Sequence, residues 1–378
     1  MDFQFTQEQQ LWHDTVHAFM EKEVGREYTR QHDESREFPE EVFKKMAQQG
    51  WLGLLVDEAE GGSAADPIMF AIFCEAIGKY SLDTAACIMT SMFTATNISR
   101  HGTEEQKRRY LKPFLDGDGK FSISISEPDA GSDAASARST AVLEGEEWVL
   151  NGNKVFCSGA HLPNATIAIL ARTSSDRYNG FSLFLVPNTT RGLHIKKMNT
   201  IVRKSLGTTE FFMDKLRIPK DALLGEVGKG WHYIGEHLEY ERLSIAASQV
   251  GNARTALDDT VRYTKDRKQF GRSLSSFQVL KHRMAENEAE LEAARLLVYS
   301  AASKMTRGER AIKEVSMAKL FCSQVLFRIA FNGMQALGGY AQLPEYDMER
   351  YFREAKHGMV GGGTNEIQRS IIAKEMGI

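Results

Sequence analysis

Phe121-Ser-Ile-Ser-Ile-Ser126 is the stretch at which the periodicity of the chain changes. Its apolar residues alternate with serines, and this period of two predicts a β-strand with one apolar face. The residues before it have the pattern of helices joined by short turns, with Thr6 placed to cap one helix and Pro39 at the start of another. We therefore expect an N-terminal α-helical domain over residues 1–118.

Short strand patterns separated by turn residues continue beyond this stretch. They are Glu147–Leu150 before an Asn151-Gly152 turn, Val155–Ser158, Ala165–Ala171, Gly180–Val186 and Glu210–Leu216. Strands of this length and spacing are typical of an antiparallel sandwich or barrel. The second predicted domain is thus an antiparallel β-sandwich or barrel over residues 119–228.

The last third of the chain contains no proline from Lys220 to Leu343. Because proline costs a helix interior about 3 kcal/mol, its absence favours long helices. Apolar residues recur every three or four positions between Phe277 and Met305, which predicts one helix of about 30 residues with a near-heptad seam. We expect a four-helix bundle over residues 229–378, and an α+β fold for the whole chain.

Composition and charge exclude several classes of protein. The chain is 42% hydrophobic and 26% charged, as in ordinary globular proteins, and its net charge of −3 with mixed signs predicts no nucleic-acid surface. No apolar run reaches the ~18–20 residues of a membrane span, and Met1–Thr6 has no targeting pattern. We therefore expect a cytoplasmic protein with four reduced, well-separated cysteines. No metal is expected, because His13 and His17 lack an acidic or cysteine partner and are predicted to face solvent from a helix.

A carboxylate interrupts an apolar stripe in the stretch Leu238-Glu-Tyr-Glu-Arg-Leu-Ser-Ile245. At helical spacing, Ile234, Leu238, Glu241, Ile245 and Ser248 share one face. Burying an ionised carboxylate costs several kcal/mol unless it is paired or its pKa rises. Glu241 is therefore either a structural residue that reaches solvent or pairs with a cation such as Arg242, or a candidate catalytic base.

Three further stretches have the composition of ligand sites. Ser126-Glu-Pro-Asp-Ala-Gly-Ser-Asp133 could form an anion-binding nest or a plain turn. Arg267-Lys-Gln-Phe-Gly271 suits a phosphate or an aromatic ring, or simply ends a charged helix. Gly361-Gly-Gly-Thr-Asn-Glu-Ile-Gln-Arg369 exposes backbone N–H groups at a helix N-terminus, or serves as a hinge.

Together, and in this order, these stretches resemble the acyl-CoA dehydrogenase family from one end of the chain to the other. The resemblance implies an FAD cofactor, with the hydroxyls of Ser126 and Ser158 bonded to the isoalloxazine ring and Phe156 standing against it. It implies contacts with the FAD of a neighbouring subunit for Arg267, Phe270, Gln335, Gly338 and Gly339. Thr364 and Glu366 would contact the cofactor from the last motif, and Ser132 and Arg242 would lie on the substrate side, Ser132 near the CoA arm.

The position of the base departs from the commonest family pattern. Many members carry the catalytic glutamate where this chain has Gly362. A minority branch, resembling isovaleryl- and long-chain acyl-CoA dehydrogenases, carries it just before an arginine on the first long helix of the last domain, and this chain has Glu241-Arg242 there. The resemblance therefore implies that Glu241 is the base and that the Gly362 N–H donates to the thioester carbonyl together with a flavin ribityl hydroxyl.

The implied reaction is the FAD-dependent α,β-dehydrogenation of an acyl-CoA to the trans-2-enoyl-CoA, in which Glu241 takes the α-proton and flavin N5 takes the β-hydride. The implied partners are the acyl-CoA, electron-transfer flavoprotein as electron acceptor, and further copies of the chain in a dimer of dimers. The alternatives are an enoyl-CoA reductase, an enzyme acting on a carrier-protein-bound acyl group, and a non-catalytic flavin- and DNA-binding relative. Ser91–Arg100, where the family's acyl tail lies, mixes apolar and polar side chains and does not decide the acyl group.

Overall fold

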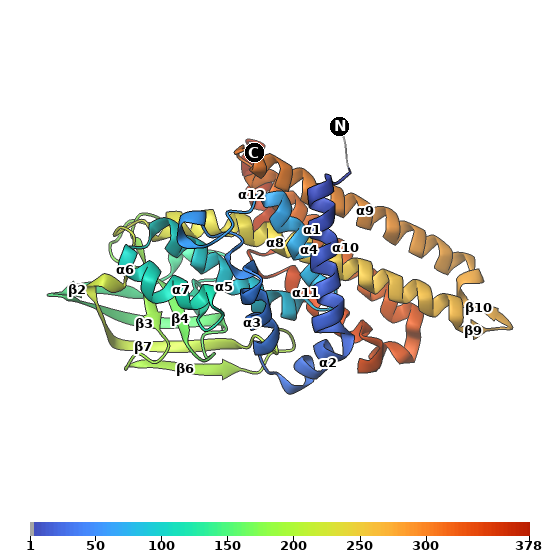
Figure 1. The fold of residues 1–378 in the computed structure, drawn as a ribbon, viewed down its shortest axis with the longest axis horizontal. Helices are drawn as coiled ribbons and strands as arrows, with labels where there is room; N and C mark the ends of the chain where they lie inside the picture. Colours follow the sequence, from blue (N-terminus) through green and yellow to red (C-terminus); the bar gives the residue numbers. More distant parts are fainter. Residues whose placement is uncertain (1–3) are drawn as a thin grey trace. The chain divides into compact units, whose positions relative to one another are not determined.

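The computed structural model describes residues 4–378 (Figure 1). Its contacts divide into two compact units: unit 1 comprises residues 4–34, 66–85 and 239–378, and unit 2 comprises residues 35–65 and 86–238. The predicted order of helices, then strands, then helices is confirmed along the chain. Among the described residues, no helix combines the length and apolar character that crossing a bilayer requires.

Unit 1 is built almost entirely from helices. They are α1 (Gln7–Phe19), α2 (Gly25–Ser35), α4 (Pro67–Gly78), the greater part of α8 (Gly230–Asp266), α9 (Gln278–Thr306), α10 (Ile312–Leu337), α11 (Met348–Gly358) and α12 (Asn365–Glu375), with a short hairpin of β9 (Lys268–Gln269) and β10 (Arg272–Ser273). The predicted helix of about 30 residues is α9, and its seam is buried from Asn287 to Ala301. Thr6 caps α1 as predicted, in a reciprocal arrangement with Gln9.

The packing of α8 against α4 fixes how α8 presents its side chains. A Cβ added to Gly251 would lie 1.9 Å from the carbonyl oxygen of Glu75, and one added to Gly78 would lie 2.3 Å from that of Ser248. Only glycine permits so close an approach of two helix backbones. Within the same unit, α10 packs against α9, α11 and α12 (Figure 1).

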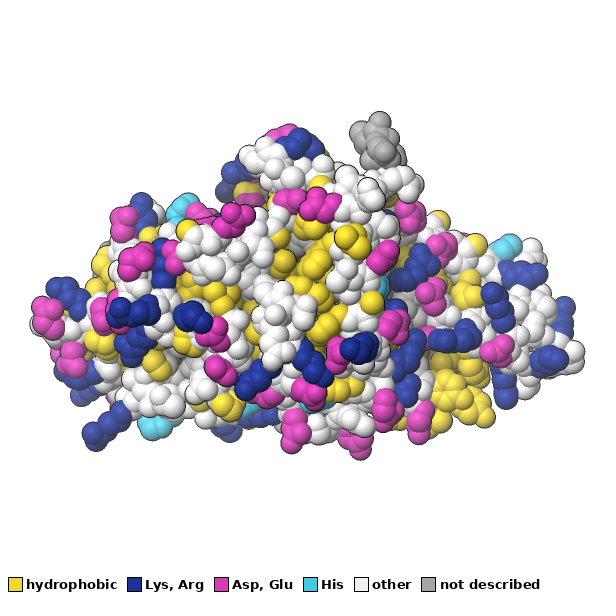
Figure 2. All heavy atoms as spheres, in the orientation of Figure 1, with side chains coloured by type: hydrophobic (Ala, Val, Ile, Leu, Met, Phe, Trp, Pro, Cys, Tyr) yellow, Lys and Arg dark blue, Asp and Glu magenta, His cyan; other side chains and the backbone are white. Residues whose placement is uncertain are grey.

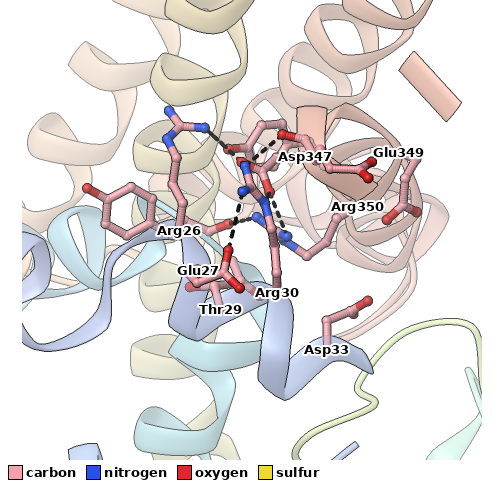
Figure 3. A network of polar contacts seen from close by, with 12 residues as sticks. Arg26, Glu27, Thr29, Arg30, Asp33, Asp347, Glu349 and Arg350 are labelled. Atoms are coloured by element: carbon pink, nitrogen blue, oxygen red, sulfur yellow. Dashed lines mark hydrogen bonds and ion pairs between the residues drawn. The ribbon is translucent and has the colours of Figure 1, made fainter. Parts of the chain in front are cut away.

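A buried network of arginines and aspartates joins α2 to the start of α11 (Figure 3). Asp347 is fully buried and accepts hydrogen bonds from Arg26 (2.9 Å) and Arg30 (2.8 Å), and it pairs with the equally buried Arg350 at 3.0 Å. Burial would raise the pKa of Asp347, but Arg30, Arg350 and Arg26 outweigh this effect and hold the pKa below its ordinary value. The ionised carboxylate is therefore part of the folded structure.

Replacing Asp347 by Asn is expected to lower the free energy of unfolding by about 3 kcal/mol, because it leaves buried guanidinium charge uncompensated. Asn tolerates the left-handed backbone at this position, where φ is 61°, so the effect reports the charge. Since the folded pKa is depressed, the stabilisation is present above the unfolded pKa of 3.8 and is lost as the pH falls through the folded pKa. Urea unfolding at pH 7 and at decreasing pH measures both effects.

Asp116→Asn is the matched control, since Asp116 pairs with Lys112 on an exposed helix turn. Such surface pairs contribute about 0.5 kcal/mol or less. Equal effects of the two substitutions would contradict a structural role for the buried charge network.

Unit 2 contains one eight-stranded sheet with strand order β6-β7-β3-β2-β4-β5-β8, and β1 pairs with β4. The strands are β1 (Lys120–Ser124), β2 (Thr140–Glu144), β3 (Glu147–Ser158), β4 (Ala165–Arg172), β5 (Phe181–Pro187), β6 (Leu193–Met198), β7 (Thr208–Pro219) and β8 (Leu223–Leu224). Most neighbours are antiparallel, as predicted, but β1 and β2 both pair with β4 in parallel. The unit also holds α3 (Glu40–Gln48), most of α5 (Leu82–His101), α6 (Glu104–Gln106) and α7 (Lys112–Leu115).

The predicted turn at Asn151-Gly152 is wrong. β3 runs without interruption from Glu147 to Ser158 and pairs with β7 on both sides of these two residues, with a shift of register between Leu150 and Gly152. Asn151 Oδ1 accepts a hydrogen bond from the Lys215 N–H at 2.8 Å. The Asn-Gly pair therefore forms a bulge inside one long strand, where it bends the strand without reversing it.

The predicted apolar face of β1 is also wrong. Ser122 and Ser124 are fully buried, whereas Ile123 is only half-buried. β1 lies in parallel beside β4, and Cys157 Sγ of β3 donates to Ser124 Oγ at 3.4 Å. When both faces of a strand are covered, the alternation of apolar and polar residues no longer tells which side chains are exposed. The small serine side chains fit the more crowded face.

Charged side chains of both signs are interspersed over the face of the molecule seen in Figure 2. This agrees with a net charge of −3 made up of 47 basic and 50 acidic residues.

Candidate active site

Glu241 lies on α8 within a stripe that is buried at its ends and partly open at its centre. Ile234 and Ser248 are buried, whereas Leu238, Glu241 and Ile245 are half-buried. The carboxylate is thus neither enclosed in the core nor on a solvent-facing helix surface. This is a position from which a carboxylate can meet a ligand.

Gly362, in the loop between α11 and α12, lies beside Glu241. A Cβ built on Gly362 would be 3.8 Å from Glu241 Oε1 and 2.7 Å from Ile245 Cδ1, and Arg242 Nε donates to the Gly362 carbonyl oxygen at 3.2 Å. A carboxylate carried at either position 241 or position 362 would therefore reach the same small volume. The structure brings together the two positions that the sequence singled out as a pair.

The backbone of Gly362 presents a free donor. Its φ is 65°, in the left-handed region that glycine adopts without strain, and its N–H has no acceptor within residues 4–378. An N–H of this kind can bind the oxygen of a ligand carbonyl.

Two buried cations lie close to this carboxylate. Arg242 is 9% exposed, and burial lowers its pKa against the opposing charges of Glu241 and Glu239. Lys319 of α10 is 0% exposed, and burial together with Arg242 lowers its pKa to about 8, while Glu241 opposes the shift. Arg242 was predicted on the substrate side. The structure places its guanidinium against the loop of residues 359–364, here called the glycine loop, where Arg242 Nε donates to the Gly362 carbonyl.

In unit 2, the structure brings Ser126, Phe156 and Ser158 together at the end of β1 and along β3. The Val155 N–H donates to the Ser126 carbonyl at 3.1 Å. The hydroxyls of Ser126 and Ser158 are half-buried and have no partner among the described residues. Phe156 is 66% exposed and has a φ of 58°, a strained conformation for an aromatic residue. An exposed ring with two free hydroxyls on neighbouring segments suits a flat, hydrogen-bonding ligand.

A buried ion pair anchors the loop that follows Ser126. Lys154 Nζ lies 3.0 Å from Glu127 Oε1, and the Glu127 carboxylate also accepts from the N–H groups of Arg138 (2.6 Å) and Ser139 (2.8 Å). Burial raises the pKa of Glu127, but Lys154 and these N–H groups outweigh it and lower the pKa. The anchor fixes the inner end of the loop, while Ser132, its predicted CoA contact, is exposed at the outer end.

A pocket of about 470 Å³ in unit 1 contains several of the residues predicted to meet a neighbouring subunit's cofactor. Arg267, Gly338 and Gly339 line it together with Tyr263 and Tyr340, and the Arg267 guanidinium lies 5.6 Å from the centre of the Tyr340 ring. No atom of residues 4–378 lies within 4 Å of a Cβ added at Gly338 or Gly339, so the backbone there is open to a ligand.

The remaining predicted residues are not among those that line this pocket. Phe270 is at the tip of the β9–β10 hairpin, 92% exposed and with a φ of 53°, and Gln335 is exposed on α10. Thr364 caps α12 by accepting from the Ile367 N–H, and Glu366 is exposed and pairs with Arg369. The roles of these residues stay predictions.

These features fit FAD, the cofactor that the resemblance implies. Ser126, Phe156 and Ser158 offer a ring contact and two hydrogen bonds, and the pocket at Arg267 offers a cation and open backbone for a phosphate.

Lys319 was missed by reasoning from the sequence, although its position carried a signal. Val315, Lys319, Cys322 and Leu326 recur at steps of four, three and four, and all four are buried. A lysine on an apolar stripe is as unusual as a glutamate on one, and the test that singled out Glu241 would have found it.

Three family models match consecutive parts of the chain. The description "Acyl-CoA dehydrogenase, N-terminal domain" matches residues 6–118, "Acyl-CoA dehydrogenase, middle domain" matches residues 122–216, and "Acyl-CoA dehydrogenase, C-terminal domain" matches residues 228–377.

Known proteins match the chain over its full length. It is 36% identical over 386 residues to the probable acyl-CoA dehydrogenase YngJ of Bacillus subtilis, covering 100% of both chains. It is 34% identical over 372 residues to the caffeyl-CoA reductase-Etf complex subunit CarC of Acetobacterium woodii, covering 98% of each. The solved FAD complex of PigA superimposes with a TM-score of 0.95 at 27% identity, covering 100% of this chain and 99% of PigA. The chain therefore belongs to the acyl-CoA dehydrogenase family of oxidoreductases.

Proposed function

We propose that the protein removes two hydrogens from an acyl-CoA thioester to give the trans-2-enoyl-CoA, with Glu241 as the catalytic base. The observation that carries this proposal is the adjacency of Glu241 and Gly362, which gives a carboxylate and a free backbone N–H side by side. α-Protons of thioesters are weakly acidic, so their removal needs both a base and a donor to the carbonyl oxygen.

The cofactor is FAD, which the related PigA structure contains. FAD supplies a hydride acceptor when it is bound. The proposed holders of its ring are Ser126, Phe156 and Ser158, and the proposed phosphate contact is Arg267. The chain's own part in the chemistry is to place the acyl-CoA, to accept the α-proton on the Glu241 carboxylate, and to donate the Gly362 N–H to the thioester oxygen.

The second candidate function is reduction of an enoyl-CoA by the same residues. CarC, to which the chain is 34% identical, is named as a subunit of a caffeyl-CoA reductase-Etf complex. In that direction Glu241 would return a proton to Cα. The same relative supports electron-transfer flavoprotein as the redox partner in either direction.

The exposed Phe270 at the tip of the β9–β10 hairpin supports an oligomer in which a second copy of the chain covers this side chain.

Anaerobic mixing experiments separate the two directions. FAD-loaded protein is mixed with saturated acyl-CoAs that are short, medium, long, branched or aromatic, and chemically reduced protein is mixed with the matching 2-enoyl-CoAs. We expect at least one saturated acyl-CoA to bleach the flavin absorbance. Reoxidation by enoyl-CoAs with no bleaching by any saturated partner would favour the reductase, and no response in either series would contradict both functions.

A further inference from the structure

The carbonyl groups of the glycine loop are held by three side chains, here called the carbonyl clamp: Arg242, Lys319 and Gln368. The Gly362 oxygen accepts from Arg242 Nε (3.2 Å) and Gln368 Nε2 (3.2 Å). The Gly363 oxygen accepts from Lys319 Nζ (2.7 Å) and Gln368 Nε2 (3.0 Å). Two successive carbonyls are therefore each held twice.

The clamp is built from the interior of the unit. Its members come from α8, α10 and α12, and all three are buried. Lys319 Nζ also donates to Asn365 Oδ1 at 3.3 Å, and Asn365 is fixed in turn by hydrogen bonds with Ser323. The lysine ammonium is thus held in one position by the loop carbonyl and a buried amide.

The hydrogen bonds of both clamp cations go to neutral groups of the glycine loop and α12. Burying a charge is costly, and Glu241 and Glu366 favour the charged form of Lys319 while burial and Arg242 oppose it. Two buried cations therefore lie close to the glycine loop, beside the Glu241 carboxylate.

The glycine loop needs such support if its N–H is to act as a donor in catalysis. Gly362 and Gly363 both have a positive φ, and glycine loses more conformational freedom on folding than any other residue. A donor stabilises developing charge effectively only when it is already in place before the charge forms.

We propose that Lys319 is a positioning residue for α-proton removal: with Arg242 and Gln368 it holds the Gly362 and Gly363 carbonyls, and so keeps the loop that carries the Gly362 N–H in place for the thioester oxygen, and its charge favours the negative charge that develops there. This rests on the proposed function. In the step concerned the Cα–H bond breaks, the proton passes to the Glu241 carboxylate, and the electron pair is delocalised onto the thioester oxygen.

The test compares FAD-loaded wild-type protein with Lys319→Met. The probe is trans-2-butenoyl-CoA labelled with ¹³C at the thioester carbonyl, and the readout is the stretching frequency of the bound carbonyl by isotope-edited infrared spectroscopy. We expect the frequency in the wild type to lie below that of the free probe and to move back toward it in Lys319→Met. Flavin reduction by a saturated acyl-CoA is expected to slow about tenfold at saturation, with a smaller change in the substrate Kd.

Lys304→Met is the control, because Lys304 pairs with Glu314 away from the loop, and it should leave the frequency unchanged. Lys319→Gln, which is neutral but keeps a donor, is the second variant if Lys319→Met does not retain FAD. A lower Tm with an unchanged carbonyl frequency in a folded Lys319 variant would overturn the proposal, as would a wild-type frequency equal to that of the free probe. Glu241→Gln should keep the shift of the carbonyl frequency. If Glu241 is not the base, this variant will instead reduce the flavin at an undiminished rate, so the two proposals fail in separate measurements.

Discussion

Replacing Glu241 by Gln is expected to slow flavin reduction by a saturated acyl-CoA by about three to four orders of magnitude, the upper range for loss of a general base. The amide keeps the size and hydrogen-bonding groups of the carboxylate but cannot accept the α-proton. Glu241 is only half-buried and FAD is expected to be held elsewhere, so the fold and FAD content should be retained. Anaerobic stopped-flow measurement of the flavin absorbance gives the rate directly.

Glu239→Gln is the matched control for this prediction. Glu239 lies on the same helix, two residues away, where the helical rotation turns its side chain from the stripe that contains Glu241. We expect the flavin of the Glu239→Gln variant to be reduced by the acyl-CoA at close to the wild-type rate. Undiminished reduction by Glu241→Gln would remove the base assignment.

Moving the carboxylate from position 241 to position 362 is expected to recover part of the activity. In a Glu241→Gly background, Gly362→Glu should raise the rate of flavin reduction about a hundredfold over Glu241→Gly alone, because both positions reach one volume. Recovery is expected to be partial, since a non-glycine residue at a φ of 65° is strained. The added Cβ would also lie 2.7 Å from Ile245 Cδ1.

The obstruction by Ile245 suggests a sharper form of the same experiment. Ile245→Val removes the Cδ1 atom that the new Cβ would meet, so adding it to the exchanged pair should increase the recovery. Gly361→Glu in the Glu241→Gly background is the control, because position 361 faces His357 and not Glu241. Equal recovery from positions 361 and 362 would show that the geometry of the pair is irrelevant.

Much of the fold could be predicted because the spacing of apolar residues along the chain matches the side chains that the structure buries. α9 lies within one residue of the predicted limits, since an apolar seam, a missing proline and flanking glycine all act locally. The Asn151-Gly152 turn failed because pairing of β3 with β7 on both sides overrides a local turn preference. The predicted apolar face of β1 is wrong because Ser122 and Ser124 are buried against distant parts of the chain such as Cys157 of β3, which no local pattern records.

Some residues of the candidate site could likewise be predicted from the sequence, and others could not. The pairing of Glu241 with Gly362 could be inferred from the sequence because a resemblance linked two distant positions, and the structure places them together. Lys319 was not inferred although it interrupts an apolar stripe, and its hydrogen-bond partners, the Gly363 carbonyl and Asn365 Oδ1, are visible only in the fold. Glu127 and Lys154 were overlooked because they lie 27 positions apart in the sequence, and only the fold shows that they pair.

The most direct test of Glu241 as the base follows the α-proton itself. An acyl-CoA that bleaches the wild-type flavin is incubated anaerobically in D₂O with the FAD-loaded protein, and deuterium at Cα of the recovered acyl-CoA is measured by mass spectrometry. We predict incorporation with the wild type and Glu239→Gln, and none above the protein-free rate with Glu241→Gln. Incorporation by Glu241→Gln at the wild-type rate would contradict the assignment.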